Sequence, residues 1–60
     1  MAINILSNHV RNVIVESVVE ATQELLPSLT GEQLARNVGA QLRSLSLEDA
    51  IGIYVEALSQ

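Results

Sequence analysis

The first long segment of this 60-residue chain carries more apolar surface than the rest of the chain can cover. Wound as a helix at about 100° per residue, residues 4–26 place a broad apolar stripe along one side. The stripe consists of Leu6, Val10, Val13, Ile14, Val18, Ala21 and Leu25. Val15, Val19 and Leu26 lie beside it and widen the apolar arc to roughly 240°, whereas a surface helix needs little more than about 100°. We therefore expect a partner, most simply a second copy of the chain.

The short length of the chain also favours association with a partner. Sixty residues form at most one domain, residues 1–60, and a domain of this size buries only about 60% of the surface of its unfolded chain. There is no cysteine for a disulfide or a thiolate metal site, and one histidine does not make a zinc site unaided. We therefore expect no metal and no cofactor, and association is the remaining route to stability.

Charge restricts the class of partner. The net charge is −4, with three arginines and no lysine, so the chain is expected to repel nucleic-acid phosphates and anionic membrane surfaces. The longest apolar runs are three residues, which excludes a bilayer-spanning segment. The N-terminus shows no basic region followed by an apolar block, so a cytoplasmic location is expected.

The order of residues predicts where the first helix ends. Its β-branched residues favour strand intrinsically, but their spacing of three and four over nearly twenty residues favours a helix. Asn4 and Ser7 are both candidate N-caps. Pro27 cannot continue the helix and disfavours helical geometry at Leu26, so the helix should end there.

Two shorter helices are predicted downstream. Thr30 and Gln33 have the spacing of a capping box, and Leu29 and Leu34 that of a hydrophobic staple. The apolar stripe of this second helix consists of Leu34, Ala35, Val38, Leu42 and Leu45.

The third helix is predicted to begin at Ser46, with Glu48 and Asp49 in its first turn. Its expected packing seam consists of Leu47, Ile51, Tyr54 and Leu58, widened by Ala50, Ile53, Val55 and Ala57. Because this pattern reaches the last residues, the C-terminus is expected to be packed.

Three carboxylates are the main candidates for a functional surface. Glu16, Glu20 and Glu24 follow one edge of the first helix at four-residue spacing. They could form a docking stripe for a basic partner, a carboxylate metal site, or a solvated face that Arg36 and Arg43 of an antiparallel second helix partly neutralise. No Glu is followed by His three residues later, which disfavours a di-metal bundle site.

Residues Leu34, Ala35, Val38, Gly39 and Ala40 resemble part of a helix-turn-helix signature. The resemblance implies a small transcriptional regulator that uses residues 33–50 to bind DNA. Downstream it weakens, because Glu48 replaces an expected buried aliphatic residue and Arg43 is the only base of the recognition segment. The alternative interpretation is that these small residues, and Gly52 in the third helix, allow close helix packing. The lone imidazole of His9 is expected at a solvated helix edge.

Together these patterns predict an all-α, three-helix unit, one long helix and two short ones, that associates into a helical-bundle dimer. The expected interface consists of Val15, Val19, Leu26 and Ile53. The expected function is non-catalytic, a dimerisation, docking or adaptor module and not an enzyme. It would bind another protein in an aliphatic groove between helices, rimmed by Glu16, Glu20 and Glu24. The alternative is the helix-turn-helix regulator.

Overall fold

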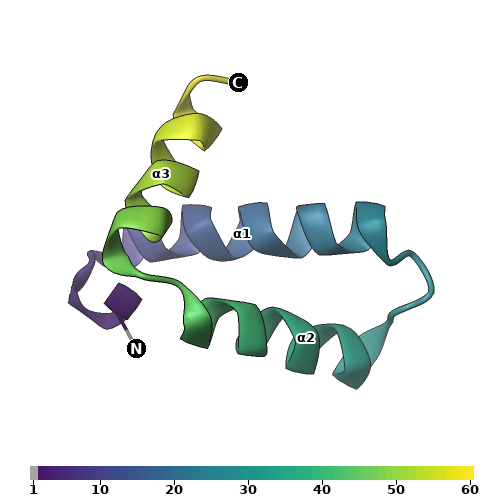
Figure 1. Cartoon of the computed structure of the whole chain (residues 1–60). Helices are drawn as coiled ribbons and strands as arrows, with labels where there is room; N and C mark the ends of the chain where they lie inside the picture. Colours follow the sequence, from purple (N-terminus) through teal and green to yellow (C-terminus); the bar gives the residue numbers. More distant parts are fainter. Residues whose placement is uncertain (1) are drawn as a thin grey trace.

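Three α-helices form the part of the chain that the computed structural model describes, residues 2–60. A 3₁₀ turn, η1 (Ala2–Ile5), precedes α1 (Asn8–Leu25), α2 (Gly31–Ser44) and α3 (Leu47–Leu58). The helix α2 runs back antiparallel beside α1, whereas α3 crosses the N-terminal half of α1 and points away from both (Figure 1). The predicted all-α class, with one long helix and two shorter ones, is confirmed.

The helix α1 begins at the second of its two candidate N-caps. Ser7 is its N-cap, and the Ser7 Oγ accepts a hydrogen bond of 3.3 Å from the backbone N–H of Val10. The residues before it form the separate turn η1, which contacts α3 and buries Ile3 in the core. Of the two candidate caps, Ser7 is therefore the one that caps the helix, and Asn4 lies within η1. The predicted end is correct, since Leu26 is the C-cap before Pro27.

The start of α2 differs from its sequence signature. Thr30 occupies the N-cap position, but its side chain makes no capping hydrogen bond, so the predicted capping box does not form. Gly31 follows at a φ of 55°, a left-handed conformation that redirects the backbone directly after the cap. This change of direction accounts for the unused hydroxyl. Further along, Ala35 is exposed, while Val38 and Leu42 are buried as predicted.

The helix α3 begins as predicted but packs through a different face. The Ser46 Oγ accepts a hydrogen bond of 3.1 Å from the backbone N–H of Asp49. Ala50, which the sequence placed at the margin, is fully buried at the centre of the packed face. Two members of the predicted seam, Ile51 and Leu58, are 44% and 62% exposed. The last residues are exposed too, so the prediction of a packed C-terminus is wrong.

The core lies between α1, α2, α3 and the turn η1. Its buried apolar residues are Ile3, Ile14, Val18, Val38, Leu42 and Ala50. On α1 the buried line is Ile14, Val18 and Thr22, whereas Ala21 and Leu25 of the predicted stripe are exposed. The stripe is therefore rotated from its predicted centre toward Thr22.

Thr22 links α1 to α2 through a polar contact inside this core. It is 3% exposed, and its hydroxyl donates to the Val18 carbonyl at 2.7 Å. The same oxygen accepts a hydrogen bond of 2.9 Å from the Gln41 amide nitrogen, which also donates to the Asn37 Oδ1 at 2.7 Å. Because each buried polar atom of Thr22 has a partner, the threonine stabilises the pairing of the two helices.

Candidate functional site

An open groove between α1 and α3 is the candidate functional site. It has a volume of about 410 Å³. Its floor consists of Ser17, Val18, Ala21, Ile53 and Ala57. Small side chains at three of these positions leave space where α3 diverges from α1, so the groove follows directly from the crossing of the two helices.

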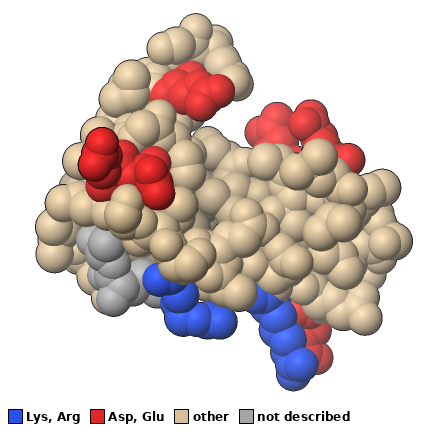
Figure 2. Space-filling view, viewed as in Figure 1, with Lys and Arg blue, Asp and Glu red and all other residues tan. Residues whose placement is uncertain are grey.

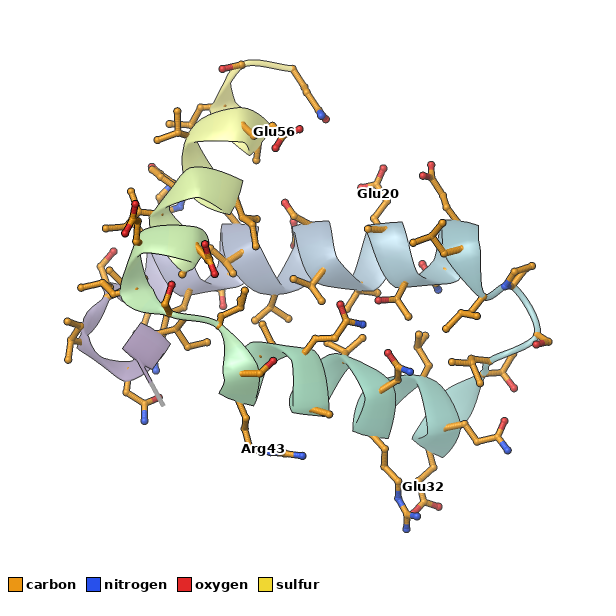
Figure 3. All side chains as sticks on the ribbon, viewed as in Figure 1. Glu20, Glu32, Arg43 and Glu56 are labelled. Carbon is orange, nitrogen blue, oxygen red and sulfur yellow. The ribbon has the colours of Figure 1, made fainter. Side chains whose placement is uncertain are left out.

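Carboxylates border this floor from both helices. Glu20 and Glu24 come from α1 and Glu56 from α3. The side chains of Glu20 and Glu56 extend into the same space above α1 (Figure 3), and acidic surface flanks the hollow between the helices (Figure 2). No arginine lines the groove. We name the surface made by these three carboxylates and the five floor residues the acidic groove.

Neither Arg36 nor Arg43 neutralises the acidic groove. Arg36 forms an ion pair of 2.5 Å with Glu32, one turn earlier on α2. Arg43 lies on the same side of the molecule, away from the acidic groove (Figures 2 and 3). The alternative in which Arg36 and Arg43 partly neutralise Glu16, Glu20 and Glu24 is therefore wrong. The outer face of α2 points away from the acidic edge of α1, so Arg36 binds the nearest carboxylate on its own helix.

One predicted rim residue lies outside the acidic groove, and one rim residue was missed. Glu16 is exposed on α1 but does not line the groove, while Glu20 and Glu24 do. Glu56 completes the rim from α3. Its role depends on how α3 crosses α1, and no spacing within the sequence reports that crossing.

The predicted interface residues lie mostly against the core of the single chain. Val15, Val19 and Ile53 are half-buried and pack on the core residues. Leu26 is 44% exposed at the end of α1. The α1 flank thus has less free apolar surface than the sequence implied, and Ile53 belongs to the floor of the acidic groove.

The segment that resembles a helix-turn-helix does not turn at its glycine, Gly39. The helix α2 continues through Gly39 as far as Ser44, and the chain turns only at Leu45 and Ser46. A Cβ on Gly39 would meet only Arg43 of the same helix, at 3.4 Å, and one on Gly52 would meet nothing within 4 Å. Neither glycine is therefore needed for a close approach between helices.

The remaining polar groups offer no second site. The His9 ring is exposed at the start of α1 and meets the Tyr54 ring edge-on, with centroids 6.3 Å apart. Within residues 2–60, no cluster of three or more histidine, aspartate or glutamate side chains is arranged to hold a metal ion. Over the same residues, the helices are too short or too polar to cross a lipid bilayer.

Comparisons of the chain with protein-family models, with curated proteins and with solved structures found no match. The functional argument therefore depends on the geometry and charge of the acidic groove.

Proposed function

We propose that this chain is a non-catalytic interaction module that docks a cationic, partly apolar segment of another protein in the acidic groove. The observation that carries the proposal is the arrangement of Glu20, Glu24 and Glu56 around an apolar floor with no arginine beside them. Carboxylates from two helices that lack a cation of their own favour one supplied by a partner.

The two parts of the acidic groove would have different roles. Contact with Ile53 and Ala21 would supply affinity by removing apolar surface from water. The carboxylates would select basic side chains, whose methylene stems can lie along the floor while their charged ends reach the rim. Because the rim is open to solvent, its charges should contribute more to selectivity and association rate than to affinity.

The proposal also includes self-association into a homodimer or a larger assembly. Support comes from the exposed large apolar side chains and from the small core, since the residues whose burial is described include only six buried apolar ones. A cytoplasmic site of action is part of the proposal as well, consistent with a sequence that contains no cysteine.

A defined peptide tests the docking part of the proposal. The probe is a fluorescein-labelled synthetic helix with two leucines on one face flanked by three arginines, and the control probe has glutamine in place of each arginine. Fluorescence anisotropy at low salt should show tighter binding of the arginine probe. Affinity for it should fall as salt rises, because the rim charges are solvent-exposed.

Matched variants locate the binding. Glu20→Gln removes a rim charge, and Glu16→Gln removes the same charge from α1 outside the acidic groove. Loss of one exposed charge pair of about 0.5–1 kcal/mol weakens binding roughly two- to fivefold. We expect that loss for Glu20→Gln and little change for Glu16→Gln. Equal affinities for the two probes, or equal losses in the two variants, would exclude docking in the acidic groove.

A further inference from the structure

The outer face of α3 carries an apolar stripe that nothing in the single chain covers. Ile51, Val55 and Leu58 are 44%, 55% and 62% exposed. Their spacing of four and three residues places them within about 60° of one another around the helix. We name these three residues the α3 stripe. It lies on the side of α3 away from Glu56, and therefore away from the acidic groove.

The molecule as a whole exposes more surface than its mass predicts. A folded monomer of 6.5 kDa is expected to expose about 3,800 Å², and this chain exposes 4254 Å². Its radius of gyration is 11.3 Å, against about 10.4 Å expected for sixty residues. The projecting α3 contributes to both differences, because its C-terminal half extends beyond the other helices (Figure 1). The chain thus exposes roughly 400 Å² more than an average folded monomer of its mass.

We infer that a second copy of this chain covers the α3 stripe, with the two α3 helices packed antiparallel about a two-fold axis at Val55. In that register Val55 faces its own equivalent, and Ile51 of each copy lies within about 1.5 Å along the helix axis of Leu58 of the other. The stripe is thus complementary to itself, as an isologous interface requires.

Charge favours a second copy over a charged partner. Asp49 and Glu56 lie about 130–155° around α3 from the centre of the stripe, so both point away from the contact. Glu48 is the one α3 carboxylate near its edge, and the antiparallel register carries it beyond the end of the opposing helix. An α3 stripe without a charge has nothing with which to select a cationic segment, unlike the acidic groove.

The available area sets the expected strength of the dimer. A stable interface buries about 800 Å² on each partner, roughly twice the excess found here. We therefore expect weak, reversible association. This inference rests on the self-association part of the proposed function and moves the interface from α1 to α3.

Sedimentation velocity between about 10 µM and 1 mM tests the inference. Val55→Glu places a charge at the two-fold axis, where burial of two like charges opposes association. Ala40→Glu adds the same charge to the exposed side of α2 and serves as the control. We expect Val55→Glu to raise the dimer dissociation constant at least tenfold and Ala40→Glu to leave it within twofold. Since Val55 is more than half exposed, both variants should retain wild-type helical circular dichroism.

Three outcomes would overturn the inference: a wild-type chain that is monomeric at 1 mM, equal dissociation constants for Val55→Glu and wild type, or equal weakening by the two variants. The arginine probe separates this result from docking. Val55→Glu should bind that probe with wild-type affinity, because the stripe and the acidic groove lie on different sides of α3. A failed probe experiment with an intact dimer would overturn docking alone.

Discussion

At the scale of single residues, Thr22 shows what an apolar pattern can and cannot locate. The period of three and four identified an apolar stripe on α1, and Thr22 was not among the residues of that stripe. In the structure Thr22 is buried, and its hydroxyl is satisfied by Val18 and Gln41. The second of these partners is nineteen residues away, so no local pattern could have supplied it.

A double-mutant cycle measures this contact. Thr22→Val keeps the shape of the side chain and removes the hydroxyl, while Gln41→Met removes the donor. A neutral hydrogen bond contributes about 0.5–1.5 kcal/mol, so we expect a coupling free energy of about 0.5–1 kcal/mol from urea unfolding. Gln41 also donates to Asn37, which limits the coupling. Strictly additive losses would show that the Thr22–Gln41 contact does not stabilise the pairing of α1 with α2.

Val19 and Leu26 were both predicted to lie in the dimer interface, but the structure gives them different surroundings. Val19 is half-buried against the core, and Leu26 is exposed at the C-cap of α1. Val19→Glu should therefore lower the free energy of unfolding by about 1–3 kcal/mol, because a carboxylate would lose water at the core edge. Leu26→Glu should change it by less than about 0.5 kcal/mol. Urea unfolding at low micromolar protein measures both effects on the monomer, and equal losses would contradict this placement of Val19.

At the scale of elements, the sequence was sufficient for three helices and for most of their ends. Ser46 and the break before Pro27 act as their residue types suggest. The Thr30–Gln33 signature does not form a capping box. A capping hydrogen bond also requires a suitable backbone conformation after the cap, and the positive φ of Gly31 changes that conformation. The face through which α3 packs was missed too. Apolar residues that span about 200° around α3 do not specify which part of that arc packs against α1.

The two cap residues allow a direct comparison. Ser46→Ala removes a side-chain hydrogen bond to the Asp49 backbone and should cost about 1 kcal/mol of stability. Thr30→Ala removes a hydroxyl that makes no capping bond and should cost only a few tenths of a kcal/mol. Chemical denaturation followed by circular dichroism compares the two variants. A loss for Thr30→Ala as large as that for Ser46→Ala would mean that the capping box does form.

At the scale of the whole molecule, the charges are separated in a way that the sequence did not indicate. Arg36 pairs with Glu32 on α2, and Arg43 lies on the side of α2 away from the acidic groove (Figure 3). The four-residue spacing of glutamates on α1 was enough to predict part of the rim. The contribution of Glu56 required the crossing of α3 over α1, which arises from how side chains of all the helices fit together.

This separation predicts how salt affects the stability of the chain. Glu56 of α3 repels Glu20 and Glu24 of α1 across the groove without a cation between them. Raising NaCl from about 20 to 300 mM shortens the Debye length from above 20 Å to below 10 Å, which weakens this repulsion. The free energy of unfolding should therefore rise by a few tenths of a kcal/mol.

Two variants of α3 assign that effect to the acidic groove. Glu56→Gln removes the repelling charge, so it should stabilise the chain at low salt and reduce the salt dependence. Glu48→Gln removes the same charge from the first turn of α3, where a carboxylate interacts favourably with the helix dipole, and should slightly destabilise the chain. Thermal unfolding at both salt concentrations measures whether each variant is more or less stable than the wild type. A decrease in stability for Glu56→Gln at low salt would mean that the groove carboxylates do not repel one another, and would remove the electrostatic basis for docking a cation there.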